Sequence, residues 1–500
     1  MRPIEPAVSA ATMRTNRSEK TPVPFPRIGG HKSVAEFQQH LADLGLELSC
    51  DASVLTAAGG SPLAEPLRVG EHIVGNRWCV HPMEGWDGTP DGNPSDLTRR
   101  RWRNFGLSGA KLIWGGEAVA VQPAGRANPN QLCHRPGTQA AFGELLGELK
   151  SAHAGCGLDA GGLLVGLQLT HSGRFSRPSR SDRPEPRIAY RHPVLDARFG
   201  LDEAAVLDDG ELRRLTDDYV AAARTAHAAG FDFVDIKACH GYLLHEFLSA
   251  YDRPGPYGGD LAGRSKLLRD VIAGVRSECP GLDVGVRLSV FDAAPYRPGE
   301  DRVGVPENPG GGYPGFGCDR DDPTVADLTQ PIALIRQLRN EDGVTLWNLT
   351  AGSPYYNPHL QRPAYFPPSD GYQPPEDPLV GCVRQMQAVR DVKRAVPDIA
   401  VVGSAYTYLQ DFLPHVAQAL VREGWTDFVG LGRMILSDWT LPSDTLLGRP
   451  RNTKLVCRTF SDCTTAPRNG LVSGCFPLDP AYKAMDEATR LKQIKRKLRK

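Results

Sequence analysis

Lys237, His240 and Tyr242 lie within six positions of one another, directly after a short apolar run. They supply a cation and two groups that can carry a proton, which general acid–base chemistry requires. Small, amide and cationic residues follow the other short apolar runs in the same way. These positions are Pro82, Met83, Glu84, Gly115, Gly116, Glu117, Gln168, Thr170, His171, Arg287, Gly403, Ser404, Gly432 and Arg433.

A flavin mononucleotide (FMN) needs this mixture of groups. Its pyrimidine edge needs an amide such as Gln168, and its N1–C2=O end, which becomes anionic on reduction, needs a cation such as Arg287. Its phosphate needs backbone N–H groups and a fixed guanidinium. The candidates for that phosphate site are Gly403, Ser404, Gly432 and Arg433. A glycine after a strand is most often only a turn, so the prediction depends on all the strand ends together.

The elements that must position these residues alternate between short apolar strands and longer helical stretches. Helical patterns cover 138–152, 211–229, 264–277, 325–339 and 379–396. The eight strand candidates are Arg77–Pro82, Lys111–Gly116, Leu163–Thr170, Phe233–Ala238, Val284–Ser289, Thr345–Thr350, Ala400–Ser404 and Asp427–Leu431.

Alternation of buried strands with helices predicts a parallel α/β sheet. Eight such units predict a closed (β/α)₈ TIM barrel, in which the residues after the strands face one site. An open doubly wound sheet is the alternative. It would need a G-x-G-x-x-G turn after its first strand, and none is present there.

Two connections are unusually long and rich in Pro, Gly and Tyr. They are Phe291–Pro323 and Ser353–Asp377, and both follow strand ends. Loops of this length in a compact domain are usually functional or disordered. We expect them to act as lids over a substrate pocket, and plain surface insertions are the alternative.

The chain resembles the Old Yellow Enzyme, or NADH:flavin oxidoreductase, family. The resemblance spans most of the chain, in the family's order, and two of its blocks are specific: Gln-Leu-x-His-x-Gly-Arg and His-Gly-Tyr-Leu-x-x-x-Phe-Leu. The matching stretches are 75–77 leading into 82–83, 168–174, 240–249, 257–259 with Arg264, 286–289 and 429–433.

The resemblance implies an FMN-binding barrel and a role for each matching residue. Gln168 and Arg287 would contact the isoalloxazine ring, and backbone at Pro82, Met83 and Gly116 would line it. Gly403, Ser404, Gly432 and Arg433 would hold the phosphate. Tyr242 would protonate the substrate, and His240 would be the second member of the pair that grips its activating group.

Lys237 and Glu84 depart from the family pattern. Many relatives carry His at the position of Lys237. A cation there could stabilise an enolate-like oxygen or anchor a carboxylate, or it could pair with Asp235 or Glu117. Glu84 replaces a small hydroxyl residue near the reactive N5 of the flavin. Its carboxylate could alter the reduction potential of the flavin or the pKa of a bound group. Alternatively, it could turn away and pair with an arginine of the Arg99–Arg103 cluster.

The C-terminal segment contains Cys457, Cys463 and Cys475, where some larger relatives carry a four-cysteine iron–sulfur motif. Thr459 and Val456 occupy the two positions where further cysteines would be needed. Three thiolates at altered spacing cannot supply four ligands, so we expect a remnant segment without a cluster. Zinc would lack a nearby His partner, and no metal site is predicted.

The sequence divides into four regions. We expect a flexible N-terminus over 1–30, a helical extension over 31–66, the FMN-binding barrel over 67–446 and a C-terminal extension over 447–500. In the second region, Ser33–Leu46 is predicted as a packing helix in which Ser33 and Glu36 form a capping box. Seven Lys or Arg among the last eleven residues predict a solvated terminal helix rather than a nucleic-acid or membrane arm.

Composition sets the cellular expectations. The 500 residues include 58 basic and 58 acidic side chains, so charge gives no argument for nucleic-acid binding. We find no transmembrane or secretory segment, and expect a cytoplasmic enzyme with a small-molecule substrate that could form homo-oligomers. An odd count of eleven cysteines favours free thiols.

The preferred hypothesis is NAD(P)H-driven reduction of an activated C=C bond in a small organic substrate, with Lys237, His240 and Tyr242 as catalytic groups. One alternative is a flavin-dependent dehydrogenase or amine demethylase that works in the oxidative direction. A second is a Schiff-base lyase with Lys237 as nucleophile. A third is a flavin-binding protein without turnover, against which Tyr242 and His240 argue. The substrate and the choice between NADH and NADPH are left open.

Overall fold

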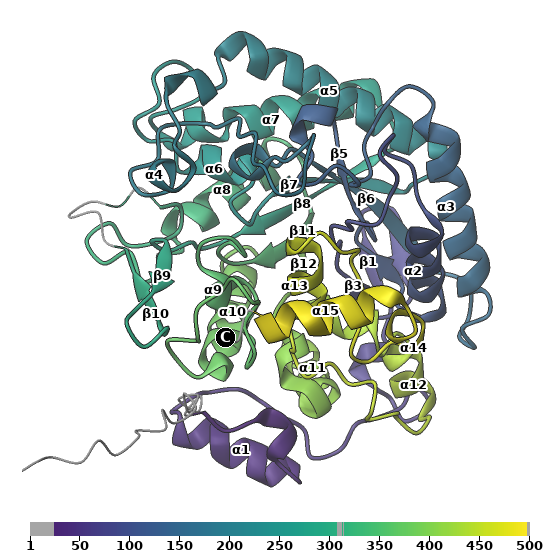
Figure 1. Cartoon of the computed structure of the whole chain (residues 1–500). Coiled ribbons are helices and arrows are strands. Elements are labelled where there is room, and N and C mark those ends of the chain that lie inside the picture. The colour runs from purple at the N-terminus through teal and green to yellow at the C-terminus, as the bar shows by residue number, and fades with distance from the viewer. Residues whose placement is uncertain (1–24, 308–312, 314, 498–500) are drawn as a thin grey trace, which may run out of the picture.

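The computed structural model describes residues 25–307, 313 and 315–497 (Figure 1). Parallel strands pair in sequence order and the last returns to the first, which closes the predicted (β/α)₈ barrel. All eight predicted strands are confirmed. They are β3 (Trp78–Val80), β4 (Leu112–Ile113) with β5 (Ala118–Ala120), β6 (Leu164–Thr170), β7 (Phe233–Ala238), β8 (Asp283–Ser289), β11 (Leu346–Thr350), β12 (Ala400–Gly403) and β13 (Phe428–Leu431).

The second barrel strand is interrupted, which the sequence reading missed. β4 and β5 both pair with β6, and Gly115 and Gly116 lie between them with φ of 139° and 50°. A Cβ on Gly115 would lie 2.8 Å from the backbone nitrogen of Gln168. Only glycine tolerates both this conformation and this close approach, so the break places β5 beside the end of β6.

Large side chains fill the lower half of the barrel. Phe233, Trp114 and Leu346 belong to an interior cluster that also includes Val69 and Val74 from a small hairpin. This hairpin, β1 (Leu67–Val69) and β2 (His72–Val74), closes the amino-terminal end of the barrel. The packed interior leaves the opposite, carboxyl end as the place for a site.

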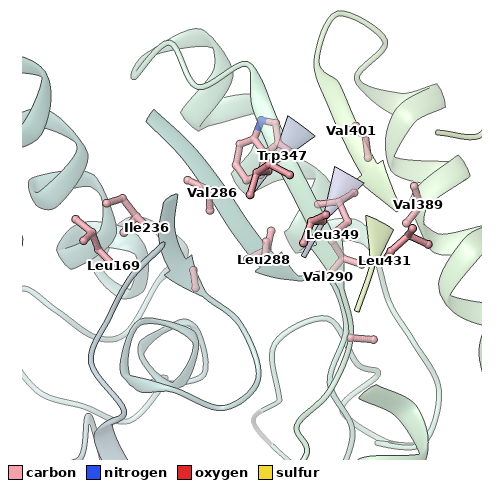
Figure 2. Close-up of a cluster of buried hydrophobic side chains, with 14 of the residues drawn as sticks. Leu169, Ile236, Val286, Leu288, Val290, Trp347, Leu349, Val389, Val401 and Leu431 are labelled. Carbon is pink, nitrogen blue, oxygen red and sulfur yellow. The ribbon is translucent and has the colours of Figure 1, made fainter. Parts of the chain in front are cut away.

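Helices surround the strands and bury the outer faces of the barrel. Figure 2 shows Leu349 of β11 and Leu431 of β13 beside Val389 of helix α10, and all three side chains belong to one buried cluster. The five predicted helices are confirmed within a few residues. The helices of the ring are α2 (Asp96–Leu107), α3 (Thr138–His153), α5 (Asp209–Ala229), α7 (Leu261–Glu278), α8 (Thr329–Asn340), α10 (Pro378–Ala395) and α11 (Leu413–Arg422).

An N-terminal helix, α1 (Val34–Asp43), packs outside the barrel as expected (Figure 1). The ring of Phe37 stacks on Phe412 at 4.6 Å. Ser33 caps the helix by accepting a hydrogen bond from the Glu36 N–H at 3.2 Å. The Glu36 carboxylate accepts from the N–H of Lys32 rather than of Ser33, so only half of the predicted capping box forms. The flexible stretch predicted for 1–30 lies largely outside the described residues.

The C-terminal segment folds back across the barrel through α12 (Leu441–Leu447), α13 (Asp462–Arg468), α14 (Pro480–Lys483) and α15 (Asp486–Lys497) (Figure 1). Helix α15 buries Ala488 and Leu491 in a cluster with Phe476 and Tyr482. The predicted terminal helix is therefore present, but it packs one face against the segment before it and is not solvated on all sides. None of the described helices is long and apolar enough to cross a membrane.

Candidate active site

A cavity of about 280 Å³ opens at the carboxyl ends of the barrel strands. Chemistry in (β/α)₈ enzymes takes place at this end of the barrel. The structure gathers most of the sequence-predicted residues around this cavity. They are Pro82, Met83, Glu84, Gln168, Lys237, His240, Tyr242, Arg287, Ser404, Gly432 and Arg433.

Gly116 and Gly403 are predicted site residues that are not among those lining the cavity. The carbonyl oxygen of Gly116 accepts a hydrogen bond from the N–H of Met83 at 3.5 Å, and a Cβ here would lie 2.8 Å from the ring of Trp102. A Cβ on Gly403 would lie 3.0 Å from the hydroxyl of Tyr406. Both glycines allow close packing behind the cavity wall, and their direct contact with a cofactor stays a prediction.

Asp235 on β7 positions the side chain of Gln168 and the backbone of Arg287 on one wall of the cavity. Its Oδ2 accepts from the side-chain amide of Gln168 at 2.5 Å, and its Oδ1 accepts from the backbone N–H of Arg287 at 2.7 Å. Burial raises the pKa of Asp235 to about 6, although these hydrogen bonds oppose the shift. Arg287 Nη1 donates to the carbonyl of Pro82 at 3.2 Å, while its Nε is buried without a partner among the described residues.

Tyr242 meets a carboxylate. Its hydroxyl donates to Glu84 Oε2 at 2.7 Å and lies 2.9 Å from the hydroxyl of Tyr355. Glu84 Oε1 accepts from the indole N–H of Trp86 at 3.0 Å, which fixes the carboxylate. Burial and the charge of Glu84 raise the pKa of Tyr242 well above its usual value. The phenol therefore keeps its proton.

Lys237 lies against the same tyrosine, with its Nζ 3.6 Å from the centre of the Tyr242 ring. Burial lowers the pKa of Lys237, and the negative charge of Glu84 opposes this shift. The alternative of an ion pair with Asp235 or Glu117 is wrong for the described residues, because Glu117 pairs with an arginine of α2 and Asp235 binds Gln168.

His240 is held in a neutral form at the end of β7. Its backbone has a φ of 65°, and its N–H donates to Ser289 Oγ at 3.0 Å. Its Nε2 lies 3.3 Å from Thr350 Oγ1 and 3.2 Å from Gln361 Nε2. Burial and then the charge of Arg287 lower the pKa of His240 well below its usual value. A neutral imidazole can hydrogen-bond a carbonyl oxygen without donating a full charge.

Glu84 does not turn away to the Arg99–Arg103 cluster, so that alternative is wrong. Arg101 of this cluster instead binds two other carboxylates, those of Asp87 and Glu117, with an Nη2–Oε2 distance of 2.5 Å to Glu117. All three side chains are buried. Glu84 is thereby left as a carboxylate that faces the cavity.

Arg433 and Arg362 make the far end of the cavity positive. Arg433 Nη2 donates to the carbonyl of Pro363 at 2.8 Å, and Arg362 Nη1 donates to the hydroxyl of Thr464. Arg433 Nη1 and Arg362 Nε are buried without partners among the described residues. Burial, followed by the charge of Arg433, lowers the pKa of Arg362 to about 10. Two adjacent guanidiniums without a carboxylate fit a phosphate.

Residues 62–305 match the sequence model of the NADH:flavin oxidoreductase / NADH oxidase family. The matched stretch is just under half of the chain. The chain is 29% identical over 247 residues to 12-oxophytodienoate reductase 1 of Oryza sativa subsp. japonica, covering 47% of this chain and 61% of that protein. It is 31% identical over 225 residues to an NADPH dehydrogenase of Listeria monocytogenes, covering 44% and 60%. The chain thus spans about 60% of the length of these relatives.

Solved structures share the fold of this chain. A morphinone reductase in complex with tetrahydroNAD superposes with a TM-score of 0.53 at 20% identity, covering 78% of this chain and 92% of that one. A 2-naphthoyl-CoA reductase complex gives a TM-score of 0.63 at 18% identity, covering 84% and 57%.

Sequence analysis missed several of the residues that line the cavity. His81 lies between Ser404 Oγ, at 3.2 Å from its Nε2, and the Asn348 amide, at 3.0 Å from its Nδ1. Its position beside Pro82 was the available signal. The C-terminal segment, interpreted as a remnant, closes one side of the cavity with residues that no strand pattern could place. They are Cys463, Thr464, Pro467, Arg468, Ser473 and Gly474.

The two predicted lids behave differently. The Ser353–Asp377 connection reaches the cavity with Pro354, Tyr355, Gln361 and Arg362. No described residue of Phe291–Pro323 lines it. The 291–323 connection forms the hairpin β9 (Tyr296–Pro298) and β10 (Gly304–Pro306) and packs against the outside of the Ser353–Asp377 connection (Figure 1). It supplies Asp292, which accepts from the hydroxyl of Tyr356 at 2.6 Å.

The eleven cysteines are free thiols. Within the described part of the chain, no group of three or more His, Cys, Asp or Glu side chains is arranged to hold a metal ion. Among the C-terminal cysteines, Cys463 lines the cavity and is half-buried.

Proposed function

We propose that this protein is a member of the NADH:flavin oxidoreductase family, an FMN-dependent oxidoreductase that uses NADH or NADPH to reduce an activated C=C bond in a small organic molecule. One observation carries the proposal: a single cavity unites a fixed amide and guanidinium, a paired-arginine end and a Lys–His–Tyr set. The curated relatives are named as a reductase and a dehydrogenase, in agreement with this chemistry.

The residues present fit FMN. Arg287 and Arg433 each have a buried nitrogen without a partner among the described residues. Arg287 could donate to a carbonyl of the flavin ring, and Arg433 could donate to the phosphate. Gln168 would bind the pyrimidine edge, and backbone at Pro82 and Met83 would face the ring. Ser404 and Gly432 would offer backbone N–H groups to the phosphate, because the Ser404 hydroxyl already donates to a carbonyl of β11 at 2.6 Å.

When bound, FMN would accept a hydride from the nicotinamide and supply one to the alkene. The chain's own residues would do the rest. The Lys237 ammonium and the neutral His240 imidazole would polarise the activating group of the substrate. The neutral Tyr242 phenol would deliver a proton to the α-carbon, and Glu84 would fix its orientation through the 2.7 Å hydrogen bond.

The oxidative direction is the second candidate, and Glu84 is the observation that favours it. In that direction the phenol could relay a proton, because as Tyr242 accepts a proton from an amine or alcohol it can pass its own proton to the Glu84 carboxylate along the existing hydrogen bond. The Schiff-base lyase hypothesis gains no support, because the matching relatives are named as reductases and dehydrogenases. Cytoplasmic location and possible homo-oligomer formation stay predictions.

The replacement Tyr242→Phe tests the assignment. We expect anaerobic flavin reduction by NAD(P)H to keep its rate, because that step needs no proton from the phenol. We expect reoxidation by an enone panel to slow by roughly 10²–10⁴-fold, the usual worth of a positioned acid. Stopped-flow absorbance separates the two steps. An unchanged reoxidation rate would show that Tyr242 is not the proton donor. If the wild type forms no saturated product from any enone, the oxidative direction would become the leading hypothesis.

A further inference from the structure

Positive charge dominates the cavity wall. Among the described lining residues, Glu84 is the sole carboxylate. The cationic lining residues are Arg101, Arg177, Lys237, Arg287, Arg362, Arg433 and Arg468. An excess of buried or half-buried charge is costly unless a partner or ligand compensates for it. We therefore looked for the group that compensates each cation.

Most of these cations have a compensating carboxylate or a proposed cofactor contact. Arg101 binds Asp87 and Glu117, and Arg468 Nη1 binds Asp370 at 2.6 Å. Lys237 interacts with the charge of Glu84, which raises the pKa of the lysine against the effect of burial. The remaining accounted cations are Arg362 and Arg433, which suit the proposed phosphate, and Arg287, which suits the proposed flavin ring.

Arg177 remains. Its backbone N–H is anchored to the carbonyl of Arg126 at 2.8 Å. Its guanidinium has no hydrogen bond or ion pair among the described residues, although it lines the cavity and is half-buried. Of the cations on this wall, it alone lacks both a carboxylate and a proposed cofactor contact.

Arg177 lies near the part of the cavity wall that Tyr355 forms. Its charge acts on Tyr355, together with that of Arg468, whose guanidinium is 5.7 Å from the Tyr355 ring. Tyr355 stacks on Phe175 at 4.0 Å and hydrogen-bonds Tyr242 at 2.9 Å. The free guanidinium therefore borders the place where the substrate would meet its proton donor.

We propose that Arg177 binds a carboxylate carried by the substrate, so that the natural substrate class is an unsaturated carbonyl compound with a separate carboxylate group. This inference rests on the proposed function and deepens it. Lys237 and His240 would hold the activating carbonyl, while Arg177 would hold the carboxylate on the side of Tyr355. A monoanionic carboxylate matches one uncompensated guanidinium, whereas a dianionic phosphate would match two.

The test uses two matched cyclic enones, one with a short carboxyalkyl chain and one with the methyl ester of that chain. Dissociation constants are measured without turnover, by calorimetry and by perturbation of the flavin spectrum of the oxidised holoenzyme. KM and kcat are measured separately. The variants are Arg177→Gln, Arg177→Lys and, as control, Arg180→Gln, because Arg180 is exposed and its one ion-pair partner among the described residues is Asp182.

We expect the wild type to bind the acid at least tenfold more tightly than the ester, with a preference that weakens as salt increases. Arg177→Gln should abolish the preference by weakening acid binding alone, Arg177→Lys should keep part of it, and Arg180→Gln should keep all of it. Equal binding of acid and ester by the wild type, or equal losses for both in Arg177→Gln, would overturn the inference.

Failure of the proposed function would look different. If the acid is preferred in binding but neither enone is reduced, the carboxylate site stands and ene-reduction is wrong. If both enones are reduced and bind equally, the proposed function stands and the role of Arg177 is wrong.

Discussion

The hydrogen bond from Tyr242 to Glu84 links a proton donor to a fixed negative charge. Because Glu84 contributes to the raised pKa of Tyr242, the phenol stays protonated to higher pH than an isolated tyrosine. Activity that needs this proton is present at low pH and is lost as pH rises through the pKa of Tyr242. We predict that Glu84→Gln moves the alkaline limb of the kcat profile for alkene reduction to lower pH.

The comparison is a pH profile of reoxidation by an enone, with Asp87→Asn as the control, because Asp87 is a buried carboxylate that does not contact Tyr242. An alkaline limb at the same pH in Glu84→Gln and the wild type would show that Glu84 does not set the state of the phenol.

Arg362 carries a second prediction at this scale. Its lowered pKa reflects burial and repulsion by Arg433, so its charge destabilises the cofactor-free protein. Arg362→Gln should leave the melting temperature of the apoprotein equal or higher, yet weaken FMN binding by about tenfold, the loss of one charge-assisted contact. Fluorescence titration of FMN and thermal melts measure both. A lower apoprotein melting temperature with unchanged FMN affinity would mean that Arg362 is structural.

At the scale of elements, Gly166 on β6 shows how the barrel interior constrains sequence. A Cβ there would overlap the ring of Phe233. Gly166→Ala should therefore lower the free energy of unfolding by about 1–3 kcal/mol, as overpacking does. Gly147 in α3 is a matched control, since a Cβ there meets nothing within 4 Å. Gly147→Ala should stabilise by about 1 kcal/mol. Denaturant unfolding measures both, and equal effects would contradict the account of β6.

Periodicity predicted these elements well because barrel strands are buried on both faces and read as continuous apolar runs. β7 was predicted with its observed ends, Phe233 and Ala238. The break between β4 and β5 was not predicted, because two glycines at the end of an apolar run are compatible both with the end of a strand and with an interruption inside it. Its cause is the close approach of Gly115 to Gln168, a contact between distant residues.

For the molecule as a whole, the C-terminal segment is held to the barrel by a buried carboxylate. Asp479 accepts from both terminal nitrogens of Arg100, at 2.7 and 2.9 Å, and caps α14 through Ala481. Asp479→Ala should cost about 1 kcal/mol from the cap alone and expose the segment that closes the cavity. We expect faster limited proteolysis between 447 and 480 and faster FMN release. Unchanged proteolysis and FMN release would show that Asp479 does not anchor the segment.

The sequence predicted the barrel and most of the cavity wall because these residues follow strand ends in order. It predicted that the 353–377 connection would lie over a pocket, but not which of its residues, Tyr355 and Arg362 among them, would reach the cavity. It did not predict Arg468 there, since a terminal segment has no periodicity that fixes where it folds back. The partner of Glu84 was equally open, because two contacts were plausible by charge and only the fold decides that Tyr242 lies within 2.7 Å.

The central claim is that the cavity binds FMN and that a nicotinamide reduces it. The most direct test is an absorbance spectrum of the purified full-length protein, followed under anaerobic conditions by additions of NADH and of NADPH. We predict a flavin spectrum near stoichiometric with protein that at least one donor bleaches. A colourless protein that FMN cannot reconstitute would contradict the account, and a bound flavin that neither donor bleaches would contradict the assigned electron donor.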